Sequence, residues 1–289
     1  MYERGWRRYA ILALFLGPSL LGLTVFTLAP IVISFGLSFT SYDLLTPATF
    51  IGGDNYARLV SDAEFWRTLR NTVSFLVGYI PLVMVAGVLV AVMLNGDILF
   101  RPLSRTMYFV PVVTSWVSVS LVWQWLYNPS LGPINSALAK VGIQGPAWLF
   151  DANWAMPAVI LTSAWKDTGF LMVIFLAGLQ GIPREYYEAA SIDGANRVQQ
   201  LLHVTLPLLA PTAIFCLSIS IINGFQVFDQ VYIMTEGGPA GATMVLVERI
   251  VANAFRYSRM GYASAISWAL FVLIFVVTVS FNRMRRWQP

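Results

Sequence analysis

The sequence is poor in the side chains from which metal sites and many catalytic centres are built. Among its 289 residues it has one cysteine, Cys216, and one histidine, His203. A single cysteine excludes an intrachain disulfide and a cysteine-based metal site. A lone histidine in a polar stretch is typical of a surface residue rather than of a ligand or base, so the sequence predicts no metal site.

Charged residues are also scarce. Only 11% of the residues are charged, whereas 57% are hydrophobic, and the mean hydropathy is +0.69. These values exclude a soluble globular chain and indicate an integral membrane protein. The net charge of +4 comes mostly from arginines spread over the loops. That distribution is typical of a chain oriented in a membrane, and it argues against nucleic-acid binding.

Three enzyme motifs are absent as well. Without a GxxxxGK[ST] phosphate loop, the chain cannot bind ATP in the usual way. Without HExxH or GxSxG, it has no signature of an intramembrane hydrolase. We therefore predict that this chain is not an enzyme and binds no cofactor of its own.

Long apolar runs are what the sequence has in abundance. The first, residues 9–42, carries no charge and far exceeds the core of a signal peptide, so we predict an uncleaved helix whose outer part bends at Pro30. Five further membrane helices are predicted at residues 71–94 with a kink near Pro81, 106–127, 154–180, 208–231 and 262–281. The predicted fold class is all-α, a polytopic membrane protein with six transmembrane helices.

The segments between these runs have their own patterns. Residues 55–70 have the spacing of an amphipathic helix at the membrane interface. Residues 128–153 are rich in glycine and proline and are predicted to be irregular, and residues 235–241 form a loop. A short surface helix is expected at residues 245–255.

Six spans place both termini on one side of the membrane. The loops on that side carry more lysine and arginine than the opposite loops, which predicts that both termini are cytoplasmic. The expected organisation is a cytoplasmic tail at residues 1–8, a membrane domain at residues 9–282 and a second cytoplasmic tail at residues 283–289.

One polar stretch, residues 183–207, interrupts the apolar chain on the cytoplasmic side. Pro183 and the acidic residues after it favour the start of a helix, which Gly194 ends because glycine tolerates left-handed geometry. A second short helix with one apolar face follows, and Pro207 is predicted to close it. Two small helices joined at a glycine corner form a surface suited to a groove in a partner.

The order of residues in this stretch resembles the EAA loop of ABC importer permeases. The likeness is carried by Glu188-Ala189-Ala190, by Gly194, and by Val204-x-Leu206-Pro207, where the family usually has isoleucine at the first of these three positions. In that family the loop couples the membrane subunit to a cytoplasmic ATPase. The resemblance implies this coupling role for Glu188, Ala189, Ala190, Asp193, Gly194, Leu206 and Pro207.

Other patches are similar to permeases of the sugar type, most closely to the maltose and glycerol-phosphate group. They are residues 52–56 (GGDNY), 177–180 (AGLQ), 182–183 (IP), 228–232 (FDQVY) and 234–239 (MTEGGP). The resemblance implies the permease fold of type I ABC importers, located in a prokaryotic inner membrane and surrounded by lipid. It also implies three protein partners: a second homologous permease, an ATPase dimer that binds ATP and Mg, and an external solute-binding protein. The implied solute is a carbohydrate.

Two alternatives stay open at this point. An ion-coupled secondary transporter would use Lys166, Asp167 and Asp229, since charges inside a membrane are functional candidates. An ABC permease for a solute other than a sugar is the second alternative. The loop around Glu188 favours the ATP-driven importer, because a secondary transporter needs no surface that docks on an ATPase.

Recurrence at steps of three or four residues suggests where the solute path lies. The residues concerned are Ser163, Lys166, Asp167 and Phe170 in one predicted helix, Ser220, Asn223, Gly224 and Val227 in the next, and Val112 and Trp116 in a third. Trp116 is the expected plate on which a sugar ring stacks. In the permeases that this chain resembles, the corresponding turns line the sugar site. The alternative is that these polar groups only hydrogen-bond between helices.

Overall fold

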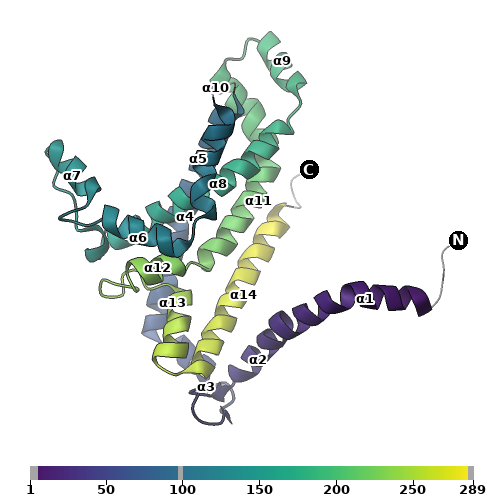
Figure 1. Cartoon of the computed structure of the whole chain (residues 1–289), viewed down its shortest axis with the longest axis vertical. Coiled ribbons are helices and arrows are strands. Elements are labelled where there is room, and N and C mark those ends of the chain that lie inside the picture. The colour runs from purple at the N-terminus through teal and green to yellow at the C-terminus, as the bar shows by residue number, and fades with distance from the viewer. Residues whose placement is uncertain (1–5, 97–99, 286–289) are drawn as a thin grey trace. The chain divides into compact units, whose positions relative to one another are not determined.

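The computed structural model describes residues 6–96 and 100–285, and the chain within them is mostly helical (Figure 1). The chain divides into two compact units, residues 1–63 with 249–272 and residues 64–248 with 273–289. Of the predicted tails, residues 1–5 and 286–289 lie outside the described residues.

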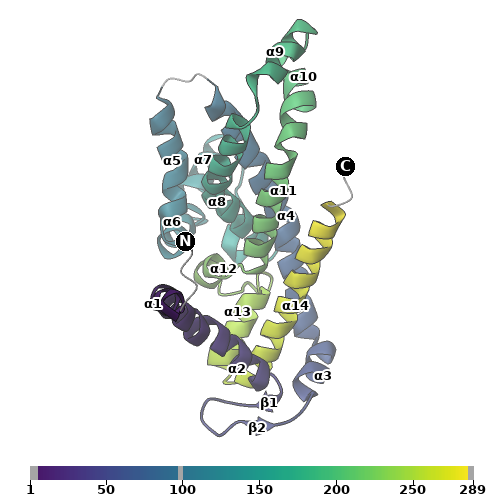
Figure 2. The ribbon, with the colours of Figure 1, turned by 90° about the vertical axis from the view of Figure 1, so that its right-hand side faces the viewer.

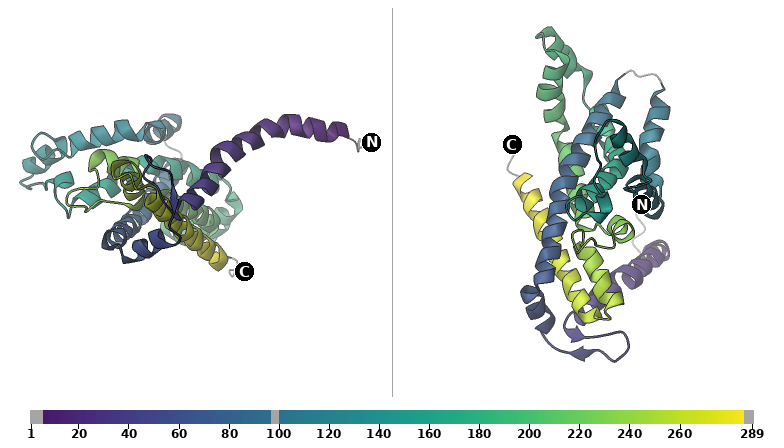
Figure 3. Two further views of the ribbon diagram at one scale, coloured as in Figure 1. Left: turned by 90° about the horizontal axis from the view of Figure 1, so that it is seen from below. Right: turned by 90° about the vertical axis from the view of Figure 1, so that its left-hand side faces the viewer.

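A single apolar helix opens the first unit. It consists of α1 (Trp6–Leu23), a π-helical turn (Thr24–Leu28) and α2 (Ala29–Leu37), which Figure 3 shows as one curved purple helix. The π-helical turn ends two residues before Pro30, and the widened turn accommodates the missing N–H and the ring of this proline. The helix predicted over the first apolar run is confirmed, and its irregular turn lies at Thr24–Leu28, before the Pro30 position at which a bend was predicted. Its apolar span, Tyr9–Leu37, is not buried by other parts of the described chain.

A short polar segment follows in the same unit. Strands β1 (Thr40–Ser41) and β2 (Thr49–Phe50) pair antiparallel. In the turn between them, Asp43 accepts hydrogen bonds from the hydroxyl and backbone N–H of Thr46 and from the N–H of Leu45. These donors stabilise the carboxylate and lower the pKa of Asp43.

The predicted amphipathic helix at residues 55–70 is wrong as one element. Helix α3 (Asp54–Ser61) ends at Asp62, whose backbone is extended. The Asp62 carboxylate accepts hydrogen bonds from Arg249 at 2.6 Å and from the Tyr262 hydroxyl at 2.5 Å. These two contacts, distant in sequence, hold Asp62 out of the helical conformation and separate α3 from the next helix.

In the second unit, α4 (Ala63–Asn95) begins eight residues before the predicted span and passes unbroken through Pro81. The polar residues of its first turns bind the predicted loop at residues 235–241. Arg67 donates to the carbonyl of Ala240, and Asn71 donates to the carbonyls of Gly241 and Met244. The loop itself is confirmed.

The prediction of one continuous helix at residues 106–127 is wrong. The structure has α5 (Arg101–Val113) and α6 (Trp116–Leu126), which are bent by 99° relative to each other (Figure 1). Pro111 removes one helical donor near the end of α5, and Thr114 is extended. Ser115 then starts α6 by accepting a hydrogen bond from the N–H of Val117.

The predicted fourth helix is confirmed to within one residue as α8 (Ala155–Gln180). It lies at the centre of a buried apolar cluster that also includes Phe75 and Tyr79 of α4 and Leu209 of α11 (Leu206–Phe225). Glycines allow the helices to approach closely. A Cβ atom added at Gly87 would lie 2.8 Å from Leu171, and one at Gly178 would lie 2.5 Å from Thr212.

Three more predictions need correction. The segment at residues 128–153 contains a helix, α7 (Pro133–Lys140), and a 3-10 turn (Trp148–Phe150). The fifth helix does not reach residue 231, because the chain turns after Phe225 and starts α12 (Asp229–Met234) with an acidic residue in its first turn.

The third correction concerns the expected surface helix at residues 245–255. The structure has α13 (Leu246–Val251) and a π-helical turn (Ala252–Arg256). Leu246, Glu248 and the three residues 252–254 are buried, so this segment is not a surface helix. The last helix, α14 (Met260–Arg285), contains the predicted span at residues 262–281.

Five of the described helical segments are long and apolar enough to cross a membrane. The bent pair of α5 and α6 supplies a sixth span if the two helices count as one. The structure therefore supports a helical membrane protein, while the count of six spans and the cytoplasmic termini stay predictions.

Candidate functional site

A polar cavity of about 290 Å³ lies where α4, α6 and α8 meet the end of α11 and the start of α12. It combines aromatic rings, side-chain amides and two carboxylates. The lining residues are Phe75, Tyr79, Trp116, Asp167, Asn223, Gly224, Gln226, Val227, Phe228, Asp229 and Gln230.

The break between α11 and α12 supplies most of this lining. Because the chain leaves the helix after Phe225, the side chains of Gln226 and Asp229 remain exposed, as does that of Asn223. Gly224 lets α4 approach at the same level, since a Cβ atom there would lie 2.4 Å from the Leu76 side chain. A polar turn is thereby held against the wall of an apolar helix.

Asp167 of α8 is held in place by α4. The Tyr79 hydroxyl donates a hydrogen bond of 2.7 Å to the Asp167 carboxylate. The Tyr79 ring is almost completely buried and stacks on Phe75, with ring centroids 5.2 Å apart and an angle of 13° between the planes. This stacking fixes the phenol and therefore orients the carboxylate at the cavity.

Lys166, its neighbour in sequence, has different partners. Its ammonium group donates to the carbonyl of Val112 at 3.1 Å and lies 4.8 Å from the centroid of the Trp116 ring. The cation–π contact and the hydrogen bond satisfy a side chain that is only 5% exposed. The two adjacent charges thus belong to different contacts, Asp167 with α4 and Lys166 with the α5–α6 break.

Half of the residues predicted for the solute path line the cavity. Trp116, Asp167, Asn223, Gly224 and Val227 are among its walls. The others, Val112, Ser163, Lys166, Phe170 and Ser220, are not.

Three residues outside the lining still support it. Lys166 donates to the carbonyl of Val112 and lies against the ring of the lining residue Trp116. The Ser163 hydroxyl accepts a hydrogen bond of 3.1 Å from the lining residue Gln230. Ser220 is buried, and Phe170 is partly exposed on α8.

Sequence reasoning missed part of the lining. Phe75, Tyr79, Gln226, Phe228 and Gln230 were not predicted as site residues. Phe75 and Tyr79 are four residues apart and share one face of α4, and this aromatic pair is the signal that could have found them. Asp229, noted only as a candidate coupling charge, is also in the lining.

The polar loop at residues 183–207 forms the second candidate site. Helix α9 (Arg184–Ile192) begins directly after Pro183, and Gly194 has a φ of +80°, as the predicted glycine corner requires. Helix α10 (Arg197–Gln200) begins with a reciprocal cap between Asn196 and Gln199. Glu188, Ala189, Asp193 and Gly194 are exposed, and Ala190 is half-buried.

The prediction that Pro207 closes the second short helix is wrong. Helix α10, a π-helical turn (Leu201–Thr205) and α11 follow one another without a break. The widened turn just before Pro207 accommodates the missing donor and the ring of proline. As a result α10 continues into α11, and the two form one continuous helix in Figure 2. Leu206 and Pro207 are exposed on it.

The polar loop at residues 183–207, called the α9–α10 loop below, lies at one end of α11, and the polar cavity lies at the other end. The 20 residues of α11 span about 30 Å at the rise of an α-helix. One continuous helix therefore connects the loop to the residues Asn223 and Gly224 of the cavity.

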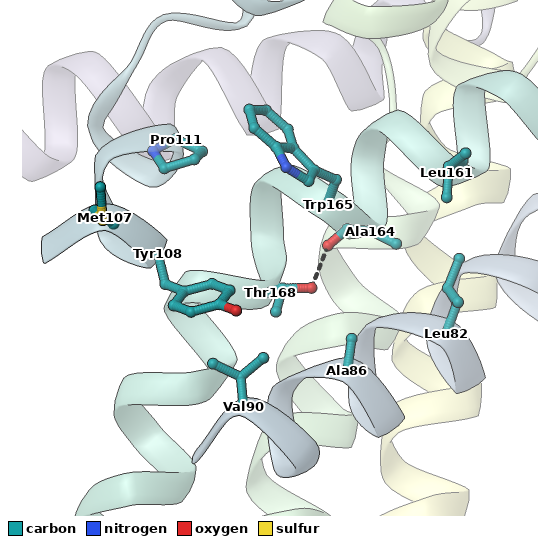
Figure 4. Close-up of a pocket in the computed structure, with 10 residues that line it drawn as sticks. All are labelled: Leu82, Ala86, Val90, Met107, Tyr108, Pro111, Leu161, Ala164, Trp165 and Thr168. Carbon is teal, nitrogen blue, oxygen red and sulfur yellow. Dashed lines mark hydrogen bonds between the residues drawn. The ribbon is translucent and has the colours of Figure 1, made fainter. Parts of the chain in front are cut away.

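A larger crevice of about 550 Å³ lies between α4, α5 and α8 (Figure 4). Its lining is mainly apolar. The Thr168 hydroxyl in this lining donates to the carbonyl of Ala164 at 2.6 Å, so it can only accept a hydrogen bond from a ligand. The crevice is therefore a poor candidate for binding a hydrophilic solute. Among the described residues, no group of three His, Cys, Asp or Glu side chains could hold a metal ion.

Comparison with known proteins supplies a family and close relatives. The family described as binding-protein-dependent transport system inner membrane component matches residues 83–288. The chain is 37% identical over 270 residues to the "Probable ABC transporter permease protein YesP" of Bacillus subtilis. The aligned region covers 92% of this chain and 87% of YesP. It is also 36% identical over 272 residues to the lactose transport system permease protein LacF of Rhizobium radiobacter. This alignment covers 92% of this chain and 90% of LacF.

A solved structure has the same fold over nearly the whole chain. It is a chain from a bacterial alginate ABC transporter in complex with an alginate pentasaccharide-bound periplasmic protein. The TM-score is 0.86 at 25% sequence identity, and the match covers 98% of this chain and 98% of the other.

Proposed function

The chain belongs to the family of binding-protein-dependent transport system inner membrane components, and we propose that it carries a carbohydrate-type solute as one permease subunit of an ATP-driven importer. The solute would be a sugar, an oligosaccharide or a polyol, received from an external binding protein and released into the cytoplasm. The protein is accordingly a multi-pass subunit of the inner membrane.

The composition of the polar cavity carries the carbohydrate proposal. A sugar offers many hydroxyl groups and an apolar ring face, so its site needs hydrogen-bonding side chains beside aromatic plates. The amides of Asn223 and Gln226 and the carboxylate of Asp167 would bind hydroxyls, while Trp116 or Phe228 would stack on the ring. The lactose permease LacF and the alginate transporter support a solute of this chemical class.

We assign the exposed α9–α10 loop to the contact with a cytoplasmic ATPase. Glu188, Ala189, Ala190, Asp193 and Gly194 lie on or beside the glycine corner, and Leu206 and Pro207 lie where the loop joins α11. A rigid helix of about 30 Å can pass a movement of the ATPase to the cavity. ATP and Mg would be bound by the ATPase, because this chain has no phosphate loop.

The proposed assembly contains a second homologous permease, an ATPase dimer and a solute-binding protein. The alginate transporter, solved with its periplasmic protein, supports the last of these partners. An ion-coupled secondary transporter is no longer favoured, since family membership implies dependence on a binding protein.

Transport assays with substitutions in the cavity test the proposal. The importer, reconstituted with its partners, should take up at least one labelled sugar from a panel of carbohydrates. Asn223→Ala and Asp167→Asn should reduce that uptake or change its selectivity and leave assembly and basal ATP hydrolysis intact. Asp151→Asn, outside the cavity, is the matched control. Unchanged affinity and rate in both cavity variants would place the solute path elsewhere.

A further inference from the structure

The polar cavity has an uneven distribution of charge. Its lining contains two acidic side chains, Asp167 and Asp229, and no basic one. The remaining lining residues with polar side-chain atoms are Asn223, Gln226 and Gln230 with their amides, Tyr79 with its hydroxyl and Trp116 with its indole N–H. A cavity lined by charge of one sign repels solutes of that sign and concentrates those of the other.

The nearest candidate for a balancing cation is turned to other partners. Lys166 precedes Asp167 in sequence, but its ammonium group is bound to the Val112 carbonyl and the Trp116 ring. Only 5% of this residue is exposed, and it is not in the lining. A solute in the cavity would contact the Trp116 ring rather than the Lys166 ammonium, whose charge acts through space and offsets part of the charge of the adjacent Asp167.

The two carboxylates are not equally available to a solute. One oxygen of Asp167 already accepts a hydrogen bond from Tyr79. Asp229, exposed at the start of α12, has no side-chain partner among the described residues. Carboxylates are acceptors only, so Asp229 can bind hydroxyl or ammonium groups and repels other anions.

We propose that this cavity selects uncharged, hydroxyl-rich carbohydrates against acidic sugars such as uronates, with Asp229 as the main determinant of that selectivity. The inference rests on the proposed function, because it assumes that a carbohydrate passes through this cavity. A sugar hydroxyl donates to either carboxylate, whereas the carboxylate of a uronate would lie near two like charges. That repulsion is stronger beside the low-dielectric wall of packed apolar helices than in bulk water.

The sign of the charge in the cavity can be measured without knowing the natural solute. In a Cys216→Ala background, Asn223→Cys places a thiol in the lining. The assembled importer is then treated with a cationic trimethylammonium and an anionic sulfonate methanethiosulfonate reagent. The ratio of the two reaction rates, divided by the same ratio for a free small thiol, reports the local potential.

We expect the cationic reagent to be favoured by about tenfold. Adding Asp229→Asn should lower this preference severalfold, and Asp167→Asn should lower it less. The matched control Asp151→Asn, which removes a carboxylate outside the lining, should leave it unchanged. A normalised ratio near one, or a preference for the anionic reagent, would overturn the inference.

Protection of the same thiol extends the test to sugars. The probes are lactose and a diuronate prepared from alginate, at equal concentration. Lactose should slow the labelling, whereas the diuronate should not. With Asp229→Asn in place, the diuronate should also slow the labelling. Equal protection by both sugars would refute the selectivity, whereas a thiol that neither reagent reaches, or that no carbohydrate in a wider panel protects, would refute the proposed solute path itself.

Discussion

At the scale of single residues, Gly169 of α8 marks the point where α5 comes too close for any side chain. A Cβ atom there would lie 2.0 Å from the Tyr108 carbonyl oxygen and 3.0 Å from the Val112 side chain. Gly169→Ala should therefore separate the two helices and lower the free energy of unfolding by about 1–3 kcal/mol. Gly22→Ala in α1, where no atom lies within 4 Å, is the control and should be neutral or slightly stabilising. Thermal denaturation in detergent measures both, and equal midpoints would contradict the close approach.

A second residue-scale prediction concerns Tyr79. Tyr79→Phe keeps the ring that stacks on Phe75 and removes the hydroxyl that donates to Asp167. The carboxylate then loses the group that orients it, and solute affinity should fall by about tenfold, as for the loss of one hydrogen bond to a charged group. Basal ATP hydrolysis by the assembled importer should be unchanged. A variant that takes up solute with wild-type affinity would show that the orientation of Asp167 does not matter for transport.

At the scale of elements, the corner between α9 and α10 is expected to control coupling. Gly194 has a φ of +80° but no atom within 4 Å of an added Cβ, so a bulky residue there costs about 1–2 kcal/mol of local strain and reshapes the corner. Gly194→Val and Glu188→Lys should both abolish solute-stimulated ATP hydrolysis while the protein still inserts. Gly142→Val imposes the same strain at a φ of +77° in another loop and should leave stimulation intact. Normal stimulation with either loop variant would remove the coupling assignment.

At the scale of the whole molecule, the predicted topology places Arg101 and Arg286 in the cytoplasm and Asp54 and Lys140 outside. In a Cys216→Ala background, single cysteines at these positions should react with impermeant reagents from opposite sides of the membrane. Arg286 lies outside the described residues. Arg101 follows α4, and the 33 residues of this helix form a rod longer than the thickness of a bilayer core, so the two ends of α4 can lie on opposite sides of the membrane. Cys216→Ala alone gives the background signal. Labelling of positions 54 and 286 from one face would exclude six spans.

Local chemistry was enough for the sequence to determine several features of this protein. Apolar runs without charge determined that it is a helical membrane protein, and α8 was placed to within one residue. The loop at residues 183–207 was predicted as helix, glycine corner and helix, because Pro183 and Gly194 act through their own backbone preferences. The family resemblance depended on the same short-range pattern and was confirmed by the match over residues 83–288.

Only the tertiary structure decided where the long apolar runs break and which side chains meet. The break at Thr114 lies inside an apolar run, and the break after Phe225 lies in a stretch that was predicted as one helix despite its polar residues, so composition alone does not reveal where either helix ends. Tyr79 and Asp167 are 88 residues apart, and no local signal predicts their contact. Adjacent Lys166 and Asp167 turn to different helices because their side chains leave α8 in different directions, and the partners they find depend on how α4 and α5 pack against α8. Backbone preference acts over a few residues, whereas a cavity is formed by residues that packing alone brings together.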